Sequence, residues 1–195
     1  MQGLSKKEYK TFHELSLSIP SLILSSQQLC DLELIMNGSF YPLKTFLNQN
    51  DYNSVLDNMR LSNNSLWPIP IMLDVSNAFI DNNTILLDEQ IALRDQEGFL
   101  LAIMKITDIW EIDKLKESNL IYGTDNVEHP GVQYLINNVK DFYITGTLTQ
   151  ISMPKHYDFE LLRLIPNELK SKFCDLKWNN IIAFQTRNPM HKAHQ

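Results

Sequence analysis

The spacing of apolar residues predicts two helices near the start of the chain. Apolar positions three or four residues apart favour one helix with Ser26 as its N-cap, which ends at Asn37-Gly38, and a second that begins at Asn50. The residues expected on their buried faces are Leu29, Leu32, Ile35 and Met36 in the first helix, and Tyr52, Val55, Leu56 and Met59 in the second.

Shorter apolar runs after these helices predict strands. In the segment 67–75 the apolar residues fall at every second position from Ile69 to Val75, and Pro68 and Pro70 place the start of this strand at a sheet edge. Further strands are expected at 84–87, 91–94, 99–110 and 142–151, with a turn at 95–98 and a bulge at Gly146. Several short strands at this spacing indicate a compact β-barrel rather than βαβ units.

The pattern changes after Met153-Pro154. The segment 166–176 predicts a helix, and Ile181–Phe184 has the length and β-branched content of a buried parallel strand. Pro189 suits the first turn of a following helix. A helix, an apolar strand and a new helix form the start of an α/β nucleotide-binding domain, so we expect one domain at 1–154 and a connector with a second domain at 155–195.

Composition narrows the classes of partner. The formal net charge of the 195 residues is -6, which argues against a general nucleic-acid-binding surface. Cys30 and Cys174 are too few for a disulfide framework. The apolar stretch 15–24 is interrupted by serines and Pro20, and no run has membrane-spanning length. We therefore expect a cytoplasmic protein that binds neither nucleic acid nor membrane.

Candidate chemistry gathers in one loop after the predicted strand 181–184. Gln185, Thr186, Arg187 and Asn188 offer amide, hydroxyl and guanidinium donors, which an oxyanion or a nucleotide phosphate requires. His191 and His194 are three residues apart, so they would share one face of the first turn of the next helix. The helix N-terminus adds free backbone N–H groups, and the arrangement predicts an anion site.

These residues closely resemble the Q-T-R-N-P-x-H-x-x-H signature of the ATP sulfurylase (sulfate adenylyltransferase) family. Segments of the first 160 residues are similar to the same family; they include 38–46, 67–70, 123–125, 129–132 and 156–159. The resemblance implies an α+β protein. Its N-terminal domain would be a PUA-like β-barrel with flanking helices, followed by the start of a Rossmann-like α/β nucleotidyltransferase domain.

The resemblance also implies a reaction, in which ATP and sulfate give adenosine 5'-phosphosulfate and pyrophosphate. Thr186, Arg187 and Asn188 would be catalytic, and Gln185 and Arg187 would bind sulfate. Gln185, Asn188, His191 and His194 would bind ATP. Mg²⁺ would arrive with ATP rather than in a protein cage, since no set of residues has metal-ligand spacing. A homo-oligomer is possible for a full-length protein.

Other interpretations stay open. Gln195 follows His194 directly and the family's later Gly-Arg-Asp-His segment is missing, so we expect the chain alone to be inactive. A non-catalytic PUA-like binding or scaffold module is the alternative, and RNA binding is a second one that the acidic balance disfavours. Asp31 and Glu33 are interpreted as helix-surface or inter-domain contacts, and His156 as a brace at the domain junction.

Overall fold

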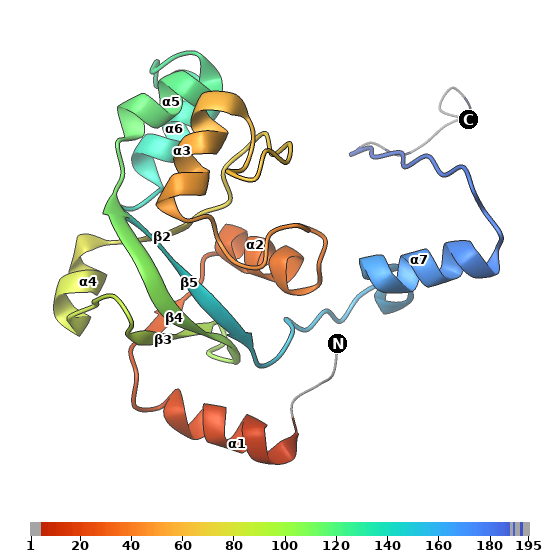
Figure 1. The fold of residues 1–195 in the computed structure, drawn as a ribbon, viewed down its shortest axis with the longest axis horizontal. Helices are drawn as coiled ribbons and strands as arrows, with labels where there is room; N and C mark the ends of the chain where they lie inside the picture. Colours follow the sequence, from red (N-terminus) through yellow and green to blue (C-terminus); the bar gives the residue numbers. More distant parts are fainter. Residues whose placement is uncertain (1–4, 188, 190–191, 193–195) are drawn as a thin grey trace. The chain divides into compact units, whose positions relative to one another are not determined.

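The computed structural model describes residues 5–187, 189 and 192, and divides the chain into two compact units, Met1–His156 and Tyr157–Gln195. Helices and strands alternate irregularly along the chain (Figure 1). In chain order the elements are α1 (Lys6–Leu15), β1 (Ser21–Ile23), α2 (Ser26–Met36), α3 (Gln49–Asn58), β2 (Leu73–Val75), α4 (Asn77–Asn83), β3 (Gln90–Arg94), β4 (Leu100–Glu111), α5 (Lys114–Tyr122), α6 (Pro130–Asn137), β5 (Phe142–Gln150), a 3-10 turn (Glu160–Leu162) and α7 (Pro166–Asp175). The predicted α+β class is confirmed.

The first unit is built on a five-stranded sheet with the order β1-β3-β4-β5-β2. β1 runs parallel to β3, and the other neighbours are antiparallel. The long strands β4 and β5 cross the unit side by side (Figure 1). Because β1 and β2 are the two edges of this sheet in the described part of the chain, the sheet is an open, curled half-barrel, whereas the strand spacing predicts a compact barrel.

A bulge interrupts the ladder between β4 and β5. The pairing passes from Ile106 opposite Gly146 to Asp108 opposite Thr145, so Thr107 is the extra residue. The predicted bulge therefore lies at Gly146, but the inserted residue belongs to β4. A Cβ atom on Gly146 would lie 2.0 Å from the carbonyl oxygen of Lys105, and only glycine permits this close approach.

Side chains at the helix starts hold the predicted helices in place. Ser25, not Ser26, caps α2, because its hydroxyl accepts from the N–H of Gln28 and the Gln28 side chain accepts from the Ser25 N–H. Asn48 caps α3. The prediction that Met59 lies in the core is wrong: it is 59% exposed, since it ends α3 in a left-handed conformation that turns it outward.

Two strand predictions are wrong in extent or type. The apolar run at 84–87 forms no strand, because Thr84 ends α4 in a left-handed conformation and only Ile85 of these four residues is buried. The alternating segment that starts at Ile69 pairs only from Leu73 to Val75, and Ile69 is exposed. Prolines on both sides of Ile69 remove the N–H groups that a ladder needs.

The core of the first unit lies on both faces of the sheet. Leu32, Leu73 and Ile144 are fully buried between α2 and one face. α1 covers part of the other face, where Phe12 and Leu15 pack on Ile103. The third group of buried side chains joins α3 to the ends of β4 and β5, through Tyr52, Val55, Leu56, Trp110 and Tyr143. Ile121 of α5 and Val139, which follows α6, pack against this last group.

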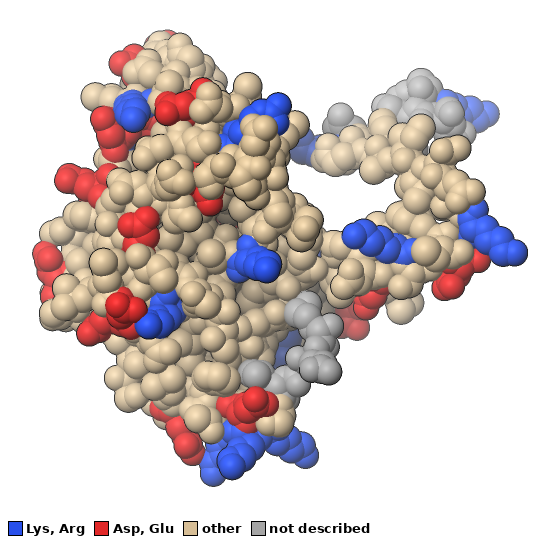
Figure 2. Space-filling view, in the orientation of Figure 1, with Lys and Arg blue, Asp and Glu red and all other residues tan. Residues whose placement is uncertain are grey.

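Charged side chains are mixed on the face of the first unit that Figure 2 shows, where Lys and Arg are scattered among more numerous Asp and Glu side chains. Within the described residues, no helix is long and apolar enough to cross a membrane. The scattered cations give no continuous basic stripe on this face, in keeping with the net charge of -6.

The second unit contains α7, which begins at Pro166 as the sequence predicts. Phe173 stacks on Trp178 with ring centroids 6.1 Å apart, and the Trp178 N–H donates to the Phe173 carbonyl. Arg163 pairs with Asp158 at 2.7 Å. These contacts are all local in sequence, so the described part of this unit has no core comparable to that of the first.

Candidate functional site

The predicted anion loop lies in the second unit and is described only in part. Gln185, Thr186 and Arg187 are all exposed. Asn188, His191 and His194 lie outside the described residues, and so do the ATP contacts predicted for them. The predicted sulfate and ATP site therefore stays a prediction.

The run before this loop differs from the prediction. Ile181–Phe184 is predicted to be a buried parallel strand, but these residues belong to no strand, and Ile182 is 95% exposed. The physical reason is that a parallel strand needs neighbours to pair its backbone groups, and the described residues of this unit supply none. No group of His, Cys, Asp or Glu among the described residues has the arrangement of a metal site.

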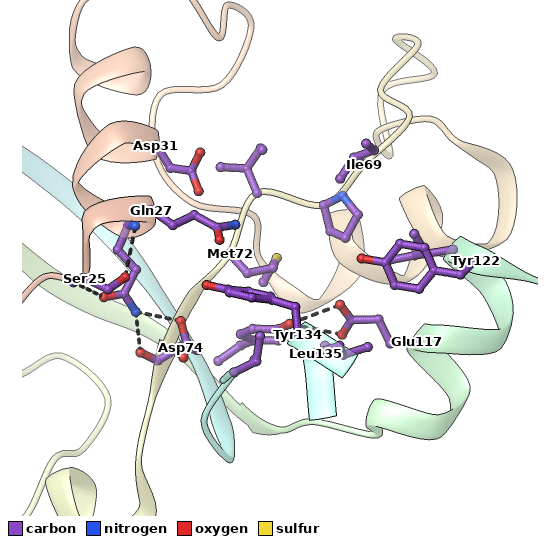
Figure 3. A pocket seen from close by; sticks show the side chains of 16 residues that line it. Ser25, Gln27, Asp31, Ile69, Met72, Asp74, Glu117, Tyr122, Tyr134 and Leu135 are labelled. Atoms are coloured by element: carbon purple, nitrogen blue, oxygen red, sulfur yellow. Dashed lines mark hydrogen bonds between the residues drawn. The ribbon is translucent and has the colours of Figure 1, made fainter. Parts of the chain in front are cut away.

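A formed pocket exists in the first unit (Figure 3). Its volume is about 160 Å³, which is enough for a small organic molecule. α2 contributes one wall, the extended segment 69–74 another, and α5 with α6 the third. The lining includes apolar side chains such as Met72 and Leu135 together with acidic and phenolic groups. This mixture of an apolar wall and a few polar groups is typical of a ligand pocket.

A buried carboxyl group lies at one end of the pocket. Glu117 of α5 is only 5% exposed. The Tyr52 hydroxyl donates to it at 2.7 Å, and the Tyr143 hydroxyl at 3.1 Å. The rings of Tyr52, Trp110 and Tyr143 pack against one another with centroids 5.6–5.9 Å apart, so the two phenol groups that contact Glu117 belong to one aromatic cluster. Burial raises the pKa of Glu117, although the two phenol hydrogen bonds oppose the rise.

The opposite end holds Asp31 and Asp74. Asp74 is engaged on both oxygens, because the Gln28 amide donates to one at 2.6 Å and the Lys140 N–H to the other at 2.9 Å. Asp31 is half-buried, and burial raises its pKa to about 6. The sequence interpretation of Asp31 as a helix-surface contact missed its place in the pocket wall, because the residues opposite it come from distant segments.

Two short motifs orient the third wall. Gly123 ends α5 in a left-handed conformation, and His129 caps α6 by accepting from the Gly131 N–H at 3.2 Å. The Tyr122 ring packs on His129 with centroids 4.9 Å apart and passes so close to Gly131 that a Cβ there would lie 2.6 Å from the ring. Gly123, His129 and Gly131 thus position Tyr122 at the pocket.

His156 and Glu33 form a separate contact at the end of the first unit. Their side chains approach to 2.7 Å, between the His156 Nε2 and a Glu33 carboxylate oxygen. Glu33 therefore contacts the end of this unit from α2, and His156 is held at the residue where the first unit ends.

The buried position of Glu117 predicts a pH dependence of stability. In the unfolded chain this carboxyl ionises near its ordinary pKa of 4.5, whereas in the folded protein it keeps its proton to higher pH. Its contribution is therefore fully present below about pH 4.5 and is lost as the pH rises through the folded pKa. The free energy of unfolding of the wild type, minus that of Glu117→Gln, is expected to fall over this range in urea titrations.

Glu128→Gln serves as the control for that prediction, because it removes a carboxyl group that is exposed and lies outside the pocket. A wild-type-minus-Glu117→Gln difference that stayed level or increased with pH would contradict the assignment of a raised pKa.

Comparisons with known proteins address both units. Residues 2–153 match the family model described as a PUA-like domain, and residues 160–195 match the model described as ATP-sulfurylase. The sulfate adenylyltransferase of Mycosarcoma maydis is 45% identical over 179 residues, and that of Aspergillus fumigatus is 48% identical over 178 residues. Each match covers 91% of this chain and 31% of the relative.

A solved structure is also similar to this chain in fold and sequence. The hexameric APS kinase from Thiobacillus denitrificans superposes with a TM-score of 0.74 at 30% identity, over 97% of this chain and 33% of that one. The chain thus spans about a third of the length of these relatives. The resemblance predicted from the sequence is confirmed.

Proposed function

The chain belongs to the PUA-like domain family over residues 2–153, and we propose that it forms the N-terminal part of a sulfate adenylyltransferase. The observation that carries the proposal is the contiguous loop from Gln185 to Asn188 followed by His191 and His194, which falls within the segment matched by the ATP-sulfurylase model. On this proposal residues 1–154 are the PUA-like domain, and residues 155–195 begin a Rossmann-like nucleotidyltransferase domain.

In the proposed reaction a sulfate oxygen attacks the α-phosphorus of ATP, and pyrophosphate leaves. Sulfate is a weak nucleophile, so positioning and electrostatic stabilisation would supply most of the catalysis. Arg187 would offer paired donors to sulfate, with the Gln185 amide beside it. Thr186 and Asn188 would orient phosphate oxygens, and His191 and His194 would donate to the ATP phosphates near a helix N-terminus.

Mg²⁺ fits this scheme as a companion of ATP. The described residues include no metal-binding group, and ATP phosphates supply oxygen ligands of the kind that Mg²⁺ prefers. When bound, the ion would neutralise charge on the departing pyrophosphate.

The similar APS kinase from Thiobacillus denitrificans is hexameric, which supports a homo-oligomer for the full-length protein. A cytoplasmic location without membrane or nucleic-acid partners remains part of the proposal.

The assay is sulfate-dependent release of pyrophosphate from ATP by the full-length protein. His191→Ala and His194→Ala should each lower the turnover by roughly tenfold or more, because each removes a donor to the ATP phosphates. His13→Ala is the matched control, since His13 is exposed on α1 in the first unit. Normal turnover in both variants, with only their melting temperatures changed, would show that the two histidines are structural.

The alternative is a non-catalytic PUA-like module, because the first unit has a core and a pocket of its own, but the named relatives support the enzyme over this alternative. A polypeptide of these 195 residues should release no pyrophosphate, because residues 181–184 lie in no strand that would position the loop. RNA binding is a further alternative, which the net charge of -6 disfavours. Filter binding to generic RNA at low and moderate salt tests it directly.

A further inference from the structure

The pocket between α2, α5 and α6 has a chemistry that adenylyl transfer does not use. All of its lining residues lie between Ser25 and Tyr143, within the first unit. The proposed sulfate and ATP contacts begin only at Gln185. The pocket is therefore a second potential site, and its role does not depend on the proposed function.

The polar groups of the pocket are divided between its two ends. Figure 3 shows Asp31 and Asp74 at one end and Glu117 with Tyr122 at the other. Between them lie Met72, Leu135 and the ring of Tyr134. A ligand that matches this arrangement has an apolar body and at least one polar head group.

The charge of the lining selects the sign of that head group. Asp74 is satisfied by Gln28 and Lys140, and Glu117 by two tyrosines. Asp31 differs, because among the described residues no hydrogen-bond donor reaches its carboxylate although it is half-buried. A half-buried carboxylate without a donor has lost part of its hydration, and a cationic ligand would add a favourable interaction with it.

The walls also exclude other ligand classes. Among the described residues no Lys or Arg side chain lines the pocket, so an anion would meet only carboxylates and phenols as its charged or acidic neighbours. Lys114 is near Glu117, but its ammonium donates to the carbonyls of Ile136 and Val139. A volume of about 160 Å³ accommodates a molecule on the scale of benzene rather than a nucleotide.

We propose that this pocket binds a small alkylammonium ion, with its ammonium group between Asp31 and Tyr134 and its aliphatic chain along Met72 and Leu135 toward Glu117. Tyr134 offers a hydroxyl oxygen and a ring face to the cation, and both favour an ammonium group. Methylene groups against Met72 and Leu135 gain burial. A diamine of four carbons would place its second ammonium at the Glu117 end.

The test titrates the isotope-labelled 195-residue chain with 1,4-diaminobutane and follows backbone amide shifts. 1,4-Butanediol is the neutral probe of the same length, and 1-aminobutane tests whether one ammonium suffices. We expect saturable shifts at α2, α5 and α6 with the amines and none with the diol. Equal shifts with the diol, or no saturation with either amine, would overturn the proposal.

Variants identify the ammonium contact. Asp31→Asn should weaken diamine binding by roughly tenfold, the scale of a partly exposed ion pair. Asp57→Asn on α3 is the matched control, because Asp57 is exposed and lies outside the pocket. Gln27→Lys at the exposed rim places an ammonium beside Asp31 and should weaken binding as well, without disturbing the core. Unchanged binding in both pocket variants would refute the site.

Discussion

Gly146→Ala is expected to lower the free energy of unfolding of the first unit by about 3 kcal/mol, at the upper end of the usual penalty for overpacking. The added Cβ would lie 2.0 Å from the Lys105 carbonyl oxygen, 2.6 Å from its carbon and 2.9 Å from the Ile106 Cα. All three are backbone atoms of β4, so no side chain can rotate away. The clash must instead separate β4 from β5, the two longest strands of the sheet.

Urea unfolding, followed by circular dichroism, measures this effect. Thr147→Ala is the control, because Thr147 is the next residue of β5 and its side chain is not buried. The Thr147 variant should unfold within about 0.5 kcal/mol of the wild type. If Gly146→Ala unfolded at the same urea concentration as Thr147→Ala, the close approach at the bulge would be wrong.

If the proposed function holds, Arg187→Ala in the full-length protein is expected to lower kcat/KM for sulfate-dependent pyrophosphate release by at least about 100-fold. The guanidinium is the only group in the loop from Gln185 to Asn188 that carries a positive charge. Its loss removes paired donors from an oxyanion whose charge must be held during the reaction. Arg187→Lys should recover only part of the rate, since one ammonium cannot reproduce the planar pair.

The structure decides which arginine is a proper control for that variant. Arg60 is exposed and donates one hydrogen bond to the Asn64 carbonyl, so Arg60→Ala should leave the rate unchanged. Arg94 is unsuitable, because it donates to Ser16, Ser21 and Gly98 and joins α1 to the sheet. Near-normal activity of Arg187→Ala, with the melting temperature of the wild type, would remove Arg187 from the proposed site.

Local rules are sufficient for the parts of the fold that depend on near neighbours. The turn at 95–98, the strand at β3 and the start of α7 at Pro166 follow from residue types within a few positions. The motif after Phe184 can likewise be recognised from the sequence, because its residues lie close together in the chain. The strand prediction at 181–184 fails because the described residues of its unit supply no pairing strand, and the one at 84–87 fails because Thr84 ends α4 in a left-handed conformation.

The pocket is not predictable by the same reasoning. Asp31 and Glu117 are 86 positions apart, and neither belongs to a motif with recognisable spacing. Their places at the two ends of one pocket depend on α2 lying beside the segment 69–74 and on α5 packing with α6. The available signal is indirect: Gly123, His129 and Gly131 fall in segments similar to the family, and they orient Tyr122 at the pocket. The similarity of these segments to the family does not by itself show that they line a pocket.

The strand order has a consequence for synthesis on the ribosome. Within the described sheet β2 pairs with β5 alone, so Leu73–Val75 must wait for residues 142–144 to emerge before its ladder can form. Thr145 similarly closes on the Phe46 carbonyl, 99 residues earlier in the chain. Such distant pairings slow folding, because the intervening loop must close before any contact stabilises it. Helix α2 and the hairpin of β3 and β4 can form early, while the apolar side of β2 stays open to chaperones until β5 leaves the exit tunnel.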